Sequence, residues 1–149
     1  MQILLDTGVL LRAFERGAVT QRDIFRALQK LWSNQHDLVT TAQNIAEFWN
    51  VSTRPTSARG GYGLPVDVVD RRVQLIERLG VVLPFSDQAY QEWRGLVVAH
   101  QITGVAVHDA RLVATMLAGN VTHLLTLNAA DFKRYPSITV FTPVDVVKL

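Results

Sequence analysis

The sequence contains no cysteine, which excludes disulfide bonds, thiolate metal sites and cysteine nucleophiles. It also lacks any apolar run near the roughly 18 residues that a membrane-spanning helix requires. The start, Met1-Gln2 followed by three apolar residues and Asp6, has neither the basic segment nor the long apolar segment of a secretory signal. We therefore expect a cytoplasmic protein with no part in a membrane.

Lysine is scarce: three lysines stand beside twelve arginines, and the formal net charge is only +2. Guanidinium groups bind phosphates and carboxylates through paired hydrogen bonds, so this bias mildly favours a nucleic acid or an acidic partner segment. An ordinary solvated surface explains the same composition. With 149 residues, 48% of them hydrophobic, the chain has the size of one compact domain, and we expect a single domain over residues 1–149.

Short apolar segments alternate with helical patterns along the chain. Strands are predicted at residues 2–5, 37–40, 81–83, 122–127 and 138–141. Helices are predicted at residues 7–16, 20–33, 42–53, 66–79, 87–100 and 105–117, with Thr20, Thr41 and Ser86 as helix caps. The Gly/Pro-rich residues 55–65 read as an internal loop. This alternation favours an α/β fold, a three-layer α/β/α sandwich with a central parallel sheet of four to five strands.

Three acidic residues are predicted to meet at one edge of this sheet. Asp6 directly follows the first strand, at the edge where parallel sheets gather their ligands. Glu47 interrupts a weakly polar helix, and Asp109 shares a helix stripe with apolar residues. An inward-facing acid must find a partner, a proton or a cation. Taken singly, the three also fit a helix cap, an exposed glutamate and a first-turn aspartate.

A cluster of carboxylates repels itself, and a hard divalent cation relieves that repulsion. Mg²⁺ or Mn²⁺ is the natural occupant, and such an ion can activate water against a phosphodiester. Asp131, which follows the fourth strand, is a fourth candidate ligand, although it fits a turn cap equally well. Whether one or two ions bind is left open.

Four segments together resemble the signature of PIN domains. They are the strand ending in Asp6-Thr7, the helix with Asn44-Ile45-Ala46-Glu47-Phe48, the stretch 108–114, and residues 124–128 followed by Asp131-Phe132. The chain's size is similar to that of VapC toxins. The resemblance implies a metal-dependent endoribonuclease that acts as the toxin of a type II toxin–antitoxin pair. It further implies a homodimer, and an antitoxin that wraps the toxin and often inserts an arginine near the acids.

Transferred to this sequence, the resemblance implies that Asp6, Glu47 and Asp109 are the catalytic and metal-binding acids. The supporting residues it implies are Thr7, Asn44, Thr126 and Asn128, of which Thr126 is the hydroxyl residue that orients the site. Two positions depart from the family pattern: Asn128 stands where an acid is common, and Gly8 stands where serine or asparagine is common.

One other function is open at this point, and a second is disfavoured. A PIN fold that binds RNA or a protein without cutting fits the same residues, whereas a haloacid-dehalogenase-like phosphohydrolase would need an acid at Gly8. Arg54, Arg59 and Tyr62, in and beside the glycine-rich loop, are predicted to contact RNA, with Tyr62 stacking on a base.

The aromatic residues Phe14, Trp32, Phe48 and Trp49 are expected mostly in the core. Any of them that line an exposed groove would suit an antitoxin helix or a dimer partner.

Overall fold

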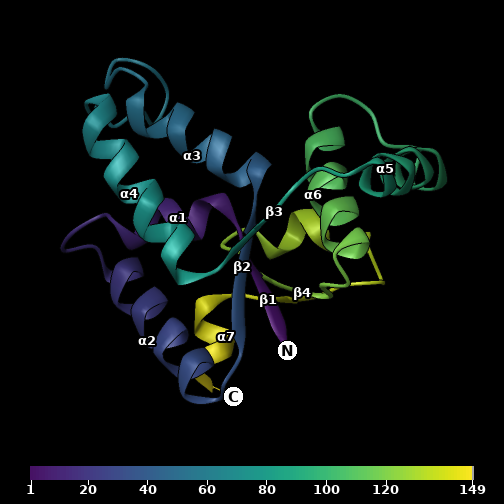
Figure 1. Cartoon of the computed structure of the whole chain (residues 1–149), viewed down its shortest axis with the longest axis horizontal. Coiled ribbons are helices and arrows are strands. Elements are labelled where there is room, and N and C mark those ends of the chain that lie inside the picture. The colour runs from purple at the N-terminus through teal and green to yellow at the C-terminus, as the bar shows by residue number, and fades with distance from the viewer. Residues whose placement is uncertain (149) are drawn as a thin grey trace.

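The computed structural model describes residues 1–148 and contains a five-stranded, fully parallel sheet (Figure 1). Its strands are β1 (Gln2–Leu5), β2 (Asp37–Thr41), β3 (Val81–Leu83), β4 (His123–Leu125) and β5 (Thr139–Phe141). The strand order is β3-β2-β1-β4-β5, so β1 is central and its carboxyl end lies between those of β2 and β4.

Helices cover both faces of the sheet. They are α1 (Thr7–Ala13), α2 (Val19–Ser33), α3 (Ala42–Thr53), α4 (Val66–Leu79), α5 (Asp87–Ala99), α6 (Ala106–Ala118) and α7 (Pro143–Lys148), with a 3₁₀ helix, η1 (Ala129–Phe132). Helices α1 to α4 and α7 lie on one side in Figure 1, and α5 and α6 lie on the other.

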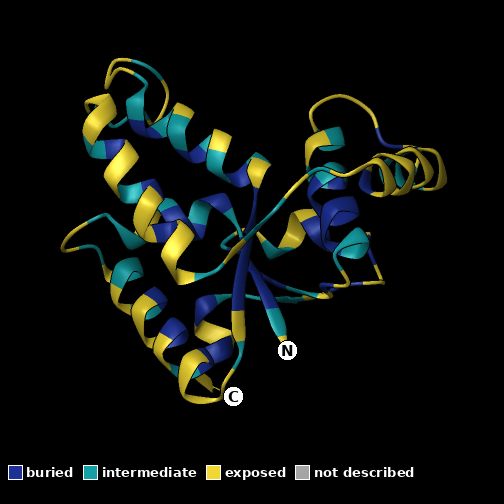
Figure 2. Cartoon of the chain, viewed as in Figure 1, coloured by how far each residue is buried: buried dark blue, intermediate teal, exposed yellow. Residues whose placement is uncertain are grey.

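Alternation along the strands divides the core into two layers. On β1, Ile3 and Leu5 belong to the layer under α1 to α4, whereas Leu4 belongs to the layer under α5 and α6. Successive side chains of a strand point to opposite faces, so a strand covered on both sides must be apolar throughout. Figure 2 shows β1 and β2 as the buried centre of the molecule, whereas the edge strands β3 and β5 are only partly buried. The predicted α/β/α sandwich with its parallel sheet is confirmed.

Several predicted boundaries are wrong. Helix α1 ends at Ala13 and not at Arg16. Helix α2 begins at Val19 with Ala18 as its N-cap and no side-chain cap, because Gly17, with a φ of 80°, turns the chain before Thr20 is reached. Strands β4 and β5 are shorter than predicted, at three residues each.

Two short elements were not predicted at all. Helix α7 and η1 have six and four residues, too few for an apolar period to become visible. Proline at the first position of α7 is a local signal for a helix start. Among residues 1–148, no helix is both long enough and apolar enough to cross a bilayer.

Candidate functional site

Asp6 lies at the carboxyl end of the central strand and is held from two sides. Its backbone N–H donates to the carbonyl of Leu125 on β4, at 3.0 Å, which brings Thr126 beside it. The Thr126 hydroxyl donates to Asp6 Oδ2 at 2.6 Å, and the Thr7 backbone N–H donates to Asp6 Oδ1 at 2.7 Å. Asp6 is therefore the N-cap of α1 and also a fixed carboxylate at the sheet edge.

A second set of hydrogen bonds connects α1 to α3. The Asn44 amide donates to Thr7 Oγ1 at 2.9 Å and makes a longer contact of 3.4 Å with Asp6 Oδ1. Thr7 in turn donates its hydroxyl proton to Glu47 Oε2 at 2.7 Å. Because Asn44 is fully buried, this network fixes the positions of both acids.

Thr41 does more than the predicted capping. It accepts from the Asn44 backbone N–H, as a helix cap should, and its hydroxyl donates to Asn44 Oδ1 at 2.6 Å. The bond to the side chain selects the orientation of the amide and so directs its NH₂ group towards Thr7. The spacing of three between Thr41 and Asn44 is the sequence signal for this pair.

Gln43 is a site residue that the sequence analysis missed. Its amide donates to Glu47 Oε1 and to the carbonyl of His108, both at 3.0 Å, and so joins α3 to the start of α6. The (i, i+4) spacing of Gln43 and Glu47 was the available signal. The link to His108 depends on tertiary packing.

Asp109 and Asp131 complete a group of four acids that interact electrostatically. Burial is the largest cause of the raised pKa of Asp109, and three neighbouring carboxylates add to it, those of Asp131, Asp6 and Glu47. Burial also raises the pKa of Asp6 against the opposing hydrogen bonds from Thr126 and Thr7. Asp131 is exposed on η1.

Asn128 is exposed and reaches the site through its backbone. Its N–H donates to Thr126 Oγ1 at 3.1 Å, so it supports the hydroxyl that orients Asp6. An amide at this position costs the cluster one negative charge but leaves that backbone contact in place.

The donor set suits a hard divalent cation. The two ion pairs found within residues 1–148 are Arg12–Glu15 and Arg71–Asp67, so none of the four acids is in an ion pair. The charge of His108 partly opposes the raised pKa of Asp109. In the same residues, no three His, Asp or Glu side chains converge closely enough to surround an ion. Mg²⁺ commonly binds through one or two carboxylates and keeps several waters, which fits carboxylates spaced in this way.

The model of the PIN domain family matches residues 3–138. The chain belongs to the PIN domain family. No curated protein sequence matches it, but solved structures share its fold. VapBC2 from Rickettsia felis, bound to a DNA fragment from their promoter, is 17% identical, with a TM-score of 0.70 over 95% of this PIN domain chain and 98% of that one.

Two further structures with this fold come from other bacteria. VapBC-1 from nontypeable Haemophilus influenzae is 16% identical with a TM-score of 0.68, over 97% of this chain and 99% of that one. Mycobacterium tuberculosis VapC20, described as a Sarcin-Ricin loop cleaving toxin, is 15% identical with a TM-score of 0.58, over 82% and 86%. At such identities the likeness shows the PIN fold.

The predicted RNA contacts of this PIN domain lie away from the acids. Arg54 is the C-cap of α3, seven residues beyond Glu47 and therefore about 10 Å further along the helix axis. The loop that follows lies at the end of α3 remote from the sheet (Figure 1). The Tyr62 hydroxyl accepts a hydrogen bond from Arg12 at 2.9 Å, and Arg59 is exposed. Their contact with RNA stays a prediction.

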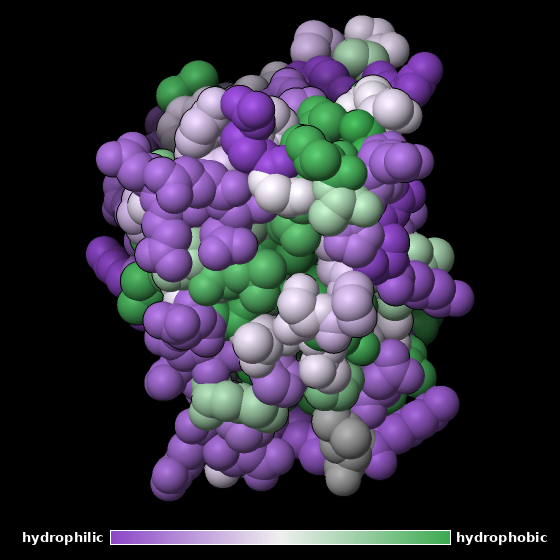
Figure 3. All heavy atoms as spheres, turned by 90° about the vertical axis from the view of Figure 1, so that its right-hand side faces the viewer, coloured by the Kyte–Doolittle hydropathy of each residue, from purple (hydrophilic) through white to green (hydrophobic). Residues whose placement is uncertain are grey.

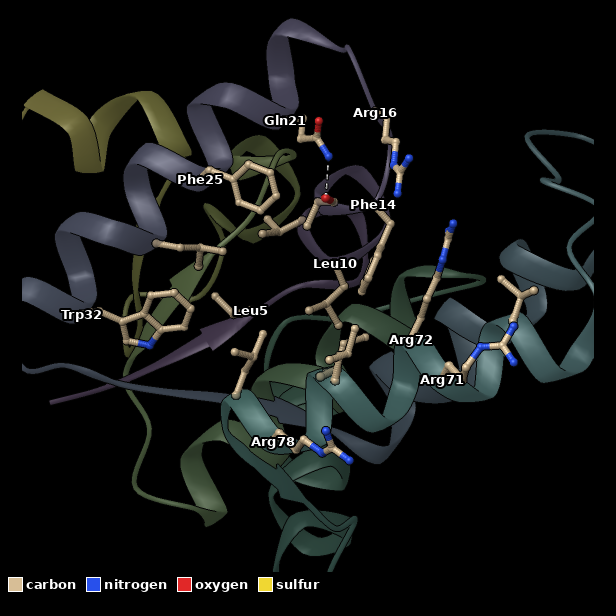
Figure 4. A pocket seen from close by; sticks show the side chains of 17 residues that line it. Leu5, Leu10, Phe14, Arg16, Gln21, Phe25, Trp32, Arg71, Arg72 and Arg78 are labelled. Carbon is tan, nitrogen blue, oxygen red and sulfur yellow. Dashed lines mark hydrogen bonds between the residues drawn. The ribbon is translucent and has the colours of Figure 1, made fainter.

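A long apolar groove runs between α1, α2 and α4 (Figure 4). Its volume is about 610 Å³, and four arginines but no acid are among the residues that line it: Arg16, Arg71, Arg72 and Arg78. Phe14 and Trp32 belong to its lining, so the expectation of a core position is wrong for Trp32, which is exposed. Phe48 is buried in the core and Trp49 packs against it, as expected.

The raised pKa values predict how the metal-free PIN domain responds to pH. Asp6 and Asp109 bind protons more tightly when folded than when unfolded, so they lower stability as pH rises from about 3.8 through their raised pKa values. In EDTA, the double variant Asp6→Asn/Asp109→Asn should therefore gain stability relative to wild type as pH rises above about 3.8. Thermal unfolding at each pH measures the difference, and a difference independent of pH would contradict the assignment.

Proposed function

We propose that this PIN domain is a metal-dependent endoribonuclease, the toxin of a type II toxin–antitoxin pair. The observation that carries the proposal is the group of carboxylates at the carboxyl edge of the sheet. Buried and partly buried hydrogen bonds fix it, and none of its acids is in an ion pair within the part of the chain that is described. Such a group is costly to fold unless a cation relieves it. Membership of the PIN family and the likeness to VapC folds support the same function.

In this proposal Asp6, Glu47 and Asp109 hold one or two Mg²⁺ or Mn²⁺ ions, and Asp131 contributes from the exposed side. A bound ion of this kind activates water and neutralises the charge that develops on a phosphodiester. Thr126 and Thr7 keep Asp6 in one orientation through their hydrogen bonds. Asn44 does the same for Thr7, and thereby for Glu47. These four contacts hold the acids in place before any ligand arrives.

Cleavage of a mixed RNA pool with Mg²⁺, with Mn²⁺ and with EDTA tests this activity. Cutting that requires the metal and disappears with EDTA supports it. RNA binding without cutting under all three conditions would instead favour the second candidate, a PIN fold that binds RNA or a protein without catalysis. Asn128, which replaces an acid common in the family, is the feature that favours that candidate.

We further propose that an antitoxin occupies the groove between α1, α2 and α4 with an acidic amphipathic helix. The groove is apolar at its base and lined by arginines without an acid, which suits an apolar helix face flanked by carboxylates. Leu75 lines the groove at 48% exposure, so Leu75→Asp should weaken binding of a synthetic acidic amphipathic helix at least about tenfold. Val144→Asp, on α7 outside the groove and 46% exposed, is the matched control; equal binding by both variants would reject the groove.

A homodimer in the cytoplasm, made of one PIN domain per chain, is the assembly that this proposal implies. Figure 3 shows apolar surface on the side of α5 and α6, where Val98 and Val105 are exposed. Sedimentation of the purified protein tests the dimer, since a monomer at all concentrations would exclude it.

A further inference from the structure

A small cavity lies between α5, α6 and the segment that joins β3 to α5. Its volume is about 260 Å³, and it is lined by Phe85, Tyr90, Trp93, Val107, His108 and Arg111. This is below the roughly 300–1,000 Å³ of sites for drug-sized ligands. The cavity therefore suits a single planar group.

The cavity adjoins the acidic cluster. His108, in its wall, immediately precedes Asp109. The carbonyl of His108 accepts from Gln43, and the same Gln43 amide donates to Glu47. One side chain thus connects the cavity wall to the site that the proposed function assigns to the scissile phosphate.

The lining combines aromatic rings with a guanidinium group. Arg111 lies over the ring of Phe85, with its Cζ 4.4 Å from the ring centroid. Tyr90 and Trp93 form a neighbouring pair of rings whose centroids are 6.1 Å apart, and the Trp93 indole N–H donates to the Val107 carbonyl at 2.9 Å. That bond fixes one wall, while Tyr90 remains 47% exposed and accessible to a ligand.

The guanidinium group of Arg111 has a hydrogen-bond donor without a partner. Its Nε is buried and has no hydrogen-bond partner among residues 1–148, and it forms no ion pair within that range. Nε itself is out of reach of a ligand, but the partly exposed guanidinium group carries further N–H donors on its two terminal nitrogens. No acidic residue lines the cavity to occupy these donors.

We propose that this cavity binds one nucleobase of the RNA strand, next to the phosphate held at the acids. The inference rests on the proposed function and adds a base-binding subsite to it. Single-stranded RNA is recognised by bases that stack on aromatic and arginine side chains. Tyr90 provides the accessible stacking surface, and Arg111 donates to an acceptor on the edge of the base.

Binding without metal tests the subsite independently of cleavage. Tryptophan fluorescence and calorimetry in EDTA compare a nucleoside 5′-monophosphate with ribose 5-phosphate, which lacks the base. The nucleotide should bind more tightly than the sugar phosphate. Equal affinities would overturn the proposal, because phosphate alone would then explain the binding.

Variants of Tyr90 and Arg111 test whether these residues contact the base. Tyr90→Ser should weaken nucleotide binding about 5- to 160-fold, the range for loss of one stacked base, and Tyr90→Phe should restore it. Arg111→Lys, which keeps the charge and loses the planar donor, should also weaken it. Phe25→Ser, which removes a similarly exposed ring on α2, is the matched control; an equal loss of binding in Phe25→Ser and Tyr90→Ser would overturn the assignment.

The two proposals fail in different ways. If nucleotide binding depends on Tyr90 while no RNA is cut, the base site is supported and the nuclease activity is rejected. If RNA is cut with an unchanged KM in Tyr90→Ser, the nuclease stands and the base site is rejected.

Discussion

Cleavage of RNA by the Asp6→Asn variant is expected to fall at least about a hundredfold. Loss of a residue that merely orients a metal ligand typically costs 10- to 100-fold, and in the proposed function Asp6 is itself a ligand. Asparagine keeps the shape of the side chain and one oxygen, which can still accept from the Thr7 N–H. Its NH₂ group then faces the Thr126 hydroxyl, which donated to the other Asp6 oxygen and can rotate to accept instead. The change therefore removes the charge while leaving the helix cap largely in place.

The control for this variant is Asp37→Asn. Asp37 is exposed at the amino end of β2, at the opposite edge of the same sheet. Initial rates on one RNA, together with the rise in unfolding temperature on adding Mg²⁺, should be lost in Asp6→Asn and kept in Asp37→Asn. Equal rates in wild type and Asp6→Asn would show that the cutting comes from another site or a contaminant.

Phe48→Ala is expected to destabilise the fold by about 3–5 kcal/mol, the cost typical of removing a buried phenylalanine. Phe48 is 0% exposed, and its ring centroid lies 5.8 Å from that of Phe14. Because small domains have about 5–15 kcal/mol of stability in total, this loss threatens folding itself. It also loosens the helix that carries Asn44 and Glu47, so metal binding should weaken with it.

Phe25→Ala provides the comparison for that loss. Phe25 is 51% exposed on α2, and its removal should cost under about 1 kcal/mol, because a half-exposed ring leaves little cavity behind. Urea unfolding of both variants measures the two free energies. Similar losses in the two would mean that Phe48 does not anchor α3 as its burial indicates.

The sequence predicted the sheet and the helices because their signals are local. Residues 2–5 are a short apolar run bounded by an acid, and such a run is typical of a strand buried on both faces. The position of Asp6 followed directly, since the carboxyl ends of parallel strands share an edge.

Other features were out of reach because they depend on tertiary placement. Gln43 binds both Glu47 and the carbonyl of His108. Because Gln43 and His108 are sixty-five positions apart in the sequence, no local pattern predicts their contact. The exposure of Trp32 likewise depends on tertiary packing. The periodicity of α2 marks its apolar face, but only the positions of α1 and α4 reveal that part of that face borders an open groove.

Helix α1 has only seven residues, yet it joins two regions of the molecule. Its first turn holds Asp6 and Thr7 in the acidic cluster, while Val9, Leu10 and Ala13 line the groove. A partner in the groove that shifts this helix therefore changes the affinity of the acids for an ion. Thermodynamic linkage makes that effect reciprocal: the factor by which the partner alters ion binding is the factor by which the ion alters partner binding.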